Sequence, residues 1–180
     1  MPEIVDSHPV IAEILEARSA LLGKARVPYE GHVFRVYNFC RALHGGGAAA
    51  DDAIAVASAF HDLAVFPDGN LDYLAPSVAM MREWSAASGR SALTPEATLM
   101  IDMHHKLSRY TGEHQELVEP FRKADMVDVA LGMIRFGLPK EFVRDVRARF
   151  PNVGFHGTLV SVIGRWIVSH PTNPLPVFKL

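Results

Sequence analysis

Apolar side chains recur every three or four residues along most of the chain, which is the spacing of one face of an α-helix. In residues 29–44 this apolar face consists of Val33, Val36, Tyr37, Cys40 and Leu43. Residues 11–22 show the same spacing. Runs of β-branched residues are short and fall inside these helical periods, so no strand is expected. The pattern therefore predicts an all-α chain, folded as a compact bundle of helices.

The residues that start and stop helices set the expected boundaries. Pro28 lies in the first turn of the helix at residues 29–44, and Gly45 ends that helix. Further helices are expected at about residues 8–22, 52–65, 76–88, 94–107, 114–131, 140–150 and 158–169. The expected N-caps of three of them are Asp6 or Ser7, Asp51 or Asp52, and Thr94.

Length and composition are those of one ordinary globular domain. The chain has 180 residues, of which 49% are hydrophobic and 21% charged, which is enough apolar side chain to bury a core. No apolar run reaches the ~20 residues that span a bilayer, and the N-terminus lacks the features of a signal peptide. A single cysteine, Cys40, excludes an internal disulfide and fits a reducing compartment. The protein is therefore predicted to be cytoplasmic, with no membrane partner.

The balance of charge bears on the class of partner. The net charge is −2 and no run of Lys and Arg is present, which argues against duplex nucleic acid. A small phosphorylated molecule needs only a local basic patch, so it stays the expected ligand class. The oligomeric state is open, with a homodimer as one option.

The pair His61-Asp62 interrupts an apolar segment, with residues 53–57 before it and residues 63–66 after it. A carboxylate in a core-facing segment costs several kcal/mol unless it is paired or binds a metal. Other polar side chains on faces predicted to be buried are His32, His104, His105 and Asp125. Each alone fits a hydrogen-bonded core residue. Together they predict a metal site, because helix bundles build such sites from inward side chains of facing helices.

The order of these residues resembles that of the HD superfamily of metal-dependent phosphohydrolases. His32 closes the sequence YEGH at residues 29–32, His61-Asp62 lies in AFHDL at residues 59–63, and Asp125 lies in KADMVD at residues 123–128. The spacings of about 30 and about 60 residues also match those of the family. The resemblance covers residues 28–131.

The resemblance implies an HD-type helical domain over residues 1–180, with a core at about residues 28–131 and C-terminal helices at 139–170 packed on it. It further implies a divalent metal, one of Mn, Co, Ni, Mg, Fe or Zn, held by His32, His61, Asp62 and Asp125. His61 and Asp62 would then belong to the catalytic machinery. Two imidazoles and two carboxylates neutralise a divalent ion and leave positions open for water, whose pKa the metal lowers.

The adjacent histidines His104 and His105 are additional to the four ligands of this one-metal pattern. In several branches of the superfamily, extra histidines between the His-Asp pair and the last Asp hold a second metal. Consecutive residues point about 100° apart on a helix, so only one of the two is expected to face the site directly, and the sequence does not choose between them. The alternative is that one His binds the substrate phosphate or caps a neighbouring helix.

Several charged residues near these positions are candidates for further roles. Arg35 is the preferred phosphate contact, because position i+3 shares a helix face with His32. Asp68, in the turn after the His-Asp segment, is a candidate general base, and a turn role fits it equally well. Weaker candidates are Asp72, Lys106, Arg109, Arg122, Lys123 and, as support for Asp125, Asp128.

Three function hypotheses follow. The first is a phosphohydrolase that cleaves a phosphomonoester or phosphodiester, with a nucleotide among the candidate substrates. The second is a di-iron oxygenase of the same fold, acting on a small polar substrate, since such enzymes use histidines beyond the basic four ligands. The third is a non-catalytic sensor of a metal or nucleotide.

Overall fold

The computed structural model of the chain describes residues 1–174 and 176–179, and for Ala49 and Asp68 the backbone alone. Within this part of the chain the regular structure is helical, and the only β-type pairing is an isolated bridge between Lys106 and Lys179. The helices are α1 (Pro9–Ala17), α2 (Ser19–Leu22), α3 (Arg26–His44), α4 (Ala48–Phe60), α5 (Val65–Asp68), α6 (Leu74–Ala87), α7 (Thr94–Met103), α8 (Gln115–Val129), α9 (Lys140–Arg149) and α10 (Phe155–Ser169). The all-α prediction is confirmed.

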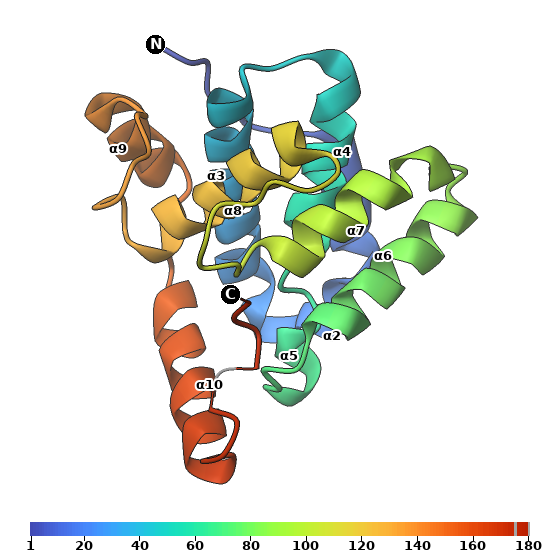
Figure 1. The fold of residues 1–180 in the computed structure, drawn as a ribbon, viewed down its shortest axis with the longest axis vertical. Coiled ribbons are helices and arrows are strands. Elements are labelled where there is room, and N and C mark those ends of the chain that lie inside the picture. Colours follow the sequence, from blue (N-terminus) through green and yellow to red (C-terminus); the bar gives the residue numbers. More distant parts are fainter. Residues whose placement is uncertain (175, 180) are drawn as a thin grey trace.

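Helix α3 lies at the centre of the bundle (Figure 1). Its large side chains Tyr29, Tyr37 and Phe39 are fully buried. Helix α8 packs along α3, α4 packs on another side of it, and α7 contacts both α4 and α8. Helices α6 and α7 form a hairpin at one side of the molecule (Figure 1). The four helices expected to carry the polar residues therefore contact one another around a common centre.

The beginning of α1 differs from the expectation. His8 is its N-cap, in place of Asp6 or Ser7, and its Nδ1 accepts a hydrogen bond from the backbone N–H of Val10 at 3.3 Å. Pro9 takes the first helical position, where its missing N–H costs nothing. The helix is also interrupted at Arg18, so the expected single helix becomes α1 and α2.

Both ends of α4 differ from the expectation as well. The helix begins after Gly47, and neither Asp51 nor Asp52 caps it. Asp51 lies in its first turn and accepts hydrogen bonds from Tyr37 Oη at 2.9 Å and Arg41 Nε at 2.6 Å. The helix ends at Phe60, so the His-Asp pair lies in the turn that follows and not inside a helix reaching residue 65.

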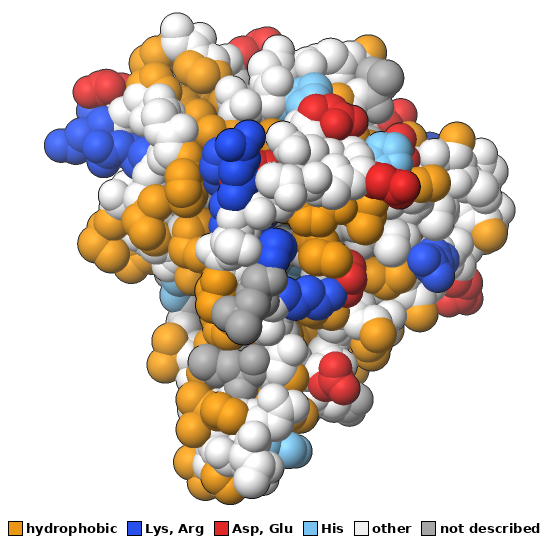
Figure 2. Space-filling model, viewed as in Figure 1, with side chains coloured by type: hydrophobic (Ala, Val, Ile, Leu, Met, Phe, Trp, Pro, Cys, Tyr) orange, Lys and Arg blue, Asp and Glu red, His pale blue; other side chains and the backbone are white. Residues whose placement is uncertain are grey.

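The C-terminal part of the chain covers one side of the bundle. Helix α10 projects from the body, and the visible face of this arm is largely hydrophobic (Figures 1 and 2). The last residues run back to the body, where Lys179 Nζ pairs with Asp102 Oδ1 at 2.6 Å and its carbonyl accepts from Leu107 N at 2.8 Å. None of the described helices combines the length and the apolar composition needed to cross a bilayer.

Candidate metal centre

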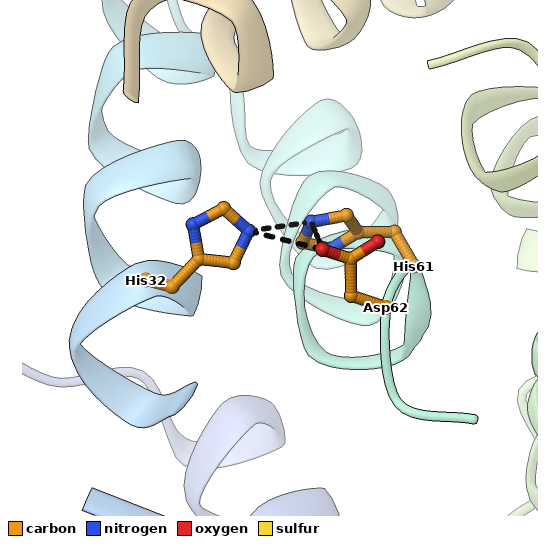
Figure 3. A group of neighbouring side chains, drawn as sticks. All are labelled: His32, His61 and Asp62. Carbon is orange, nitrogen blue, oxygen red and sulfur yellow. Dashed lines mark hydrogen bonds and ion pairs between the residues drawn. The ribbon is translucent and has the colours of Figure 1, made fainter. Parts of the chain in front are cut away.

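The polar residues singled out in the sequence meet at one buried point. His32 comes from α3 and Asp125 from α8, whereas His61-Asp62 and His104-His105 follow the C-terminal ends of α4 and α7. His32, His61, Asp62, His104 and Asp125 are buried, each at most 5% exposed as a whole residue. Figure 3 shows the rings of His32 and His61 pointing toward each other, with the Asp62 carboxylate beside them.

The turn after α4 fixes the direction of the His-Asp pair. The backbone N–H of Leu63 donates to Phe60 O, and that of Val65 donates to Asp62 O, both at 3.1 Å. These i to i+3 hydrogen bonds tighten the chain beyond the last α-helical turn. As a result His61 and Asp62, although adjacent, both reach the centre of the bundle.

Four donor atoms form the first group of potential ligands. His32 Nε2 and His61 Nε2 are 2.9 Å apart, and each lies 3.6 Å from Asp62 Oδ2. Asp125 Oδ1 lies 3.7 Å from His32 Nε2 and 3.8 Å from His61 Nε2. Ligands ~2.1 Å from a metal ion are about 3.0 Å apart at octahedral angles and about 3.4 Å apart at tetrahedral angles. The His32–His61 separation is close to the octahedral value, and the other separations of the first group are a few tenths of an ångström above the tetrahedral value.

The second carboxylate oxygens of the same two aspartates face a second group. Asp62 Oδ1 lies 3.4 Å from His104 Nε2, and Asp125 Oδ2 lies 3.9 Å from His105 Nδ1. Asp62, His104 and His105 thus gather donor atoms within 4.8 Å of one another, as do His32, His61 and Asp62. Both adjacent groups have two imidazoles, and Asp62 and Asp125 each offer one oxygen to each group.

The hydrogen bonds of the imidazoles show which nitrogen carries a lone pair. His61 Nδ1 lies 2.9 Å from Ser58 O, and His104 Nδ1 lies 2.7 Å from Ile101 O. A carbonyl only accepts, so each Nδ1 must carry a proton, and in the neutral imidazole each Nε2 then presents its lone pair to the centre. Both histidines use the same device, a hydrogen bond to the carbonyl three residues earlier at the end of a helix.

The second group contains two buried ligand atoms that face each other without a hydrogen bond, which fits a cation. Within the described residues, Asp62 Oδ1 and His104 Nε2 are buried and have no hydrogen-bond partner. Buried polar atoms without partners are costly, and such a pair of facing acceptors needs either a proton or a metal ion between them. The residues present therefore fit a metal ion.

Asp128 supports the centre from behind His32. Its Oδ2 lies 2.7 Å from His32 Nδ1, and its carboxylate accepts from Arg35 Nε at 2.6 Å, Arg35 Nη2 at 2.9 Å and Arg147 Nη1 at 3.2 Å. The remaining Arg35 nitrogen, Nη1, donates to Phe150 O at 2.9 Å. A carboxylate behind a ligating histidine fixes the ring and raises its basicity. Arg35, expected to contact a phosphate, thus has all its nitrogens engaged and acts on the centre through Asp128.

The charges at the centre shift the pKa values of its members. Burial lowers the pKa of His32, but contacts with Asp128 and Asp62 outweigh it and raise the pKa to about 9. Burial lowers the pKa of His61 to about 3, with the neighbouring His32 and His104 adding to the effect. Burial raises the pKa of Asp125 to about 6, against the influence of His104 and His32. Without a metal, the proton on His32 therefore supplies part of the positive charge that a bound cation would bring.

The other sequence candidates lie outside this group. Arg122 donates to both carboxylate oxygens of Glu119 at 2.8 Å, and Lys123 Nζ pairs with Glu119 at 3.3 Å. Asp72 is exposed, and its backbone N–H donates to Asn70 Oδ1 at 2.7 Å in a turn. Asp68 ends α5, and its side chain lies outside what the structure describes.

Two aromatic residues at the centre were not expected from the sequence. Tyr73 is buried, and its hydroxyl lies 2.6 Å from His105 Nε2, which leaves Nδ1 as the atom that faces Asp125. Phe155, at the start of α10, stacks on the His32 ring with centroids 4.1 Å apart. Neither residue belongs to a polar motif, and only the chain path brings them to the centre.

Comparison of the chain with protein-family models, with curated proteins and with solved structures found no match.

Proposed function

We propose that the protein is a metal-dependent phosphohydrolase of the HD type, which cleaves a phosphomonoester or phosphodiester. The observation that carries the proposal is the convergence of His32, His61, Asp62 and Asp125 at one buried point, with separations between donor atoms of 2.9–3.8 Å. These four residues occur in the order that the resemblance to the superfamily requires. Nothing in an ordinary helical core calls for two imidazoles and two carboxylates at its centre.

The residues of the chain would perform distinct tasks in that reaction. A divalent metal, when bound, supplies a nucleophile at neutral pH by lowering the pKa of water, and a positive charge for the phosphoryl oxygens. His32 and His61 would hold it through Nε2, and Asp62 and Asp125 through their carboxylates. Asp128 and the carbonyl of Ser58 would keep the two rings in the correct tautomer. Phe155 and the surrounding helices exclude bulk water, which strengthens the electrostatic interactions at the centre.

The experiment is hydrolysis of 4-nitrophenyl phosphate and bis(4-nitrophenyl) phosphate by purified protein with added Mn, Co or Ni. Asp62→Ala and His61→Ala are expected to lose at least about 100-fold in rate, since each removes a proposed ligand. Asp145→Ala and His170→Ala serve as controls, because Asp145 pairs with Arg144 on α9, His170 is exposed, and neither side chain belongs to the centre. Equal activity in all five proteins, or none in the wild type with any metal, would contradict the proposal.

The second candidate is a di-iron oxygenase of the same fold, favoured by one specific observation. His104 and His105 complete a second group of donors that shares Asp62 with the first group. A centre of two irons would use both groups. Two irons per chain and a visible absorption band in protein purified without chelator would favour the oxygenase, whereas bound Mn, Co, Ni or Mg would favour the hydrolase.

A further inference from the structure

A cavity of about 220 Å³ opens directly beside the metal centre. Asp125, His105 and Tyr73 form its polar end. The rest of its wall is apolar, with Leu71, Met126, Val129, Leu159, Ile163 and Phe178 among the lining side chains. The cavity is larger than the apolar cavity of ~150 Å³ that takes up benzene in a well-studied case, so it has room for a compact organic group.

The walls of the cavity lead away from the centre in one direction. On α8, Val129 follows Asp125 by one helical turn, so this wall begins at a proposed ligand and continues with an apolar side chain. On α10, Leu159 and Ile163 are also one turn apart and complete the wall provided by that helix. A molecule with its reactive group at Asp125 and His105 would therefore place its remaining part between α8 and α10.

The C-terminal segment forms the outer wall. Val177 and Phe178 line the cavity, and the centroids of the Phe178 and His105 rings lie 5.6 Å apart. The ion pair of Lys179 with Asp102 holds this segment on the body. Phe178 and Val129, both in the wall of the cavity, are 41% and 38% exposed.

The chemistry of the wall decides which organic group fits. Among the described residues that line the cavity, none is Lys, Arg, Ser, Thr, Asn or Gln. A base, a ribose or a second phosphate placed here would lose its hydrogen bonds to water without replacement, which costs ~1–3 kcal/mol for each polar group. An alkyl or aryl group would gain free energy from burial instead.

We infer that this cavity binds the organic part of the substrate, and that the substrate is the phosphate ester of a compact apolar alcohol or phenol and not a nucleotide. The inference rests on the proposed function for the identity of the reactive group. The apolar character of the organic part is inferred from the cavity alone. The proposed function and the cavity assignment can therefore fail separately.

The test is the binding of n-alkylphosphonates from methyl to hexyl to the Mn-loaded protein, measured by isothermal titration calorimetry. We expect the dissociation constant to fall about fourfold for each added methylene group until the cavity is filled. Adenosine 5′-monophosphate is expected to bind more weakly than hexylphosphonate. A dissociation constant independent of chain length, or tighter binding of the nucleotide, would overturn the inference.

A parallel series uses butanol, pentanol and hexanol with the metal-free protein, followed by the NMR shifts of its methyl groups. Shifts of Ile163 and Val129 that grow with chain length support the cavity even where the protein hydrolyses no phosphate ester. Turnover of phosphate esters with no dependence on the organic group, and no such shifts, would leave the proposed function standing and remove the cavity assignment.

Two tryptophan substitutions on α10 test whether the dependence of binding on chain length arises in this cavity. Ile163→Trp fills the cavity, and it is expected to abolish the dependence on chain length while Mn binding is retained. Val160→Trp is the matched control, because Val160 lies on the same helix, is 69% exposed and does not line the cavity. Equal loss of the chain-length dependence in both variants, or no loss of it in either variant, would contradict the assignment of the cavity. Should Ile163→Trp fail to fold, the wild-type series still decides the question.

Discussion

His32 and His61 face each other through Nε2 atoms that lie 2.9 Å apart in the interior of the bundle. The Nδ1 atom of His61 is held by the carbonyl of Ser58, and that of His32 by the carboxylate of Asp128. Two lone pairs at this distance repel each other unless a cation lies near both. In the absence of a metal a proton on His32 serves this purpose, and a metal ion would have to displace that proton.

Metal binding is therefore expected to release a proton near neutral pH. The pKa of His32, about 9, lies above the ordinary value of 6.5, so His32 carries its proton at pH 7.5 and must lose it to coordinate a metal. Calorimetry of Mn or Zn binding in buffers with different ionisation enthalpies should give release of about one proton at pH 7.5. The release should decline as the pH passes 9, where His32 is already neutral. Metal affinity should rise as the pH increases from 7.5 toward 9 and level off above 9.

The same shift bears on the stability of the metal-free protein. A histidine whose pKa is raised by folding stabilises the native state fully below the unfolded-state pKa of 6.5, and this contribution is lost as the pH rises through about 9. The metal-free wild type should thus lose free energy of unfolding between pH 6.5 and 9. Urea denaturation over this range should show a smaller loss in His32→Gln. Identical pH profiles in both proteins would contradict the assignment.

Removal of the Asp128 carboxylate should weaken metal binding without touching a ligand. In Asp128→Asn, His32 loses the partner that fixes its ring, and we expect metal affinity to fall about 10- to 100-fold. The buried Arg35 also loses its counterion, so the variant should be destabilised by about 3–5 kcal/mol. Asp145→Asn is the control, because that carboxylate pairs with Arg144 at the surface and should change neither quantity by more than about 0.5 kcal/mol.

The two groups of donors predict a distinct result for each ligand variant. His104→Ala removes a donor of the second group alone, so a protein with two metals per chain should keep one. Asp62→Ala affects both groups, because its two oxygens face different histidines, and both metals should be lost. Metal analysis after dialysis measures these ratios, with His170→Ala as the control. A single metal in the wild type, retained in His104→Ala, would show that the second group is not a metal site.

Much of the fold and of the centre could be predicted from the sequence. The helices followed from apolar spacing and from residues such as Pro28 and Gly45, since these effects act within a few residues of the chain. The expectation of a metal site rested on the cost of burying such groups apart, and the choice of His32, His61, Asp62 and Asp125 rested on the resemblance to the HD superfamily. The end of α4 at Phe60 was missed, because hydrogen bonds that tighten a last turn leave no clear mark in an apolar sequence.

Contacts between distant segments could not be predicted in the same way. Arg35 shares a helix face with His32, yet its partners Asp128 and Phe150 come from other parts of the chain. The sequence pattern alone therefore could not show that the Arg35 side chain pairs with these residues. Tyr73 and Phe155 reach the centre for the same reason. The choice between His104 and His105 also required tertiary structure, which buries the first and places the second beside Tyr73.

Gly31, next to His32, provides a test of how closely the bundle packs around the centre. A Cβ atom at this position would lie 2.8 Å from the carbonyl oxygen of Pro151 and 3.2 Å from Arg35 Nη1. Gly31→Ala should therefore destabilise the protein by about 1–3 kcal/mol in urea denaturation, although alanine is the better helix former. Gly164→Ala is the matched control, because it also lies inside a helix but its Cβ would meet nothing within 4 Å, so it should stabilise the protein by about 0.5–1 kcal/mol. Stabilisation by both substitutions would show that α3 does not approach Pro151 as closely as the structure has it.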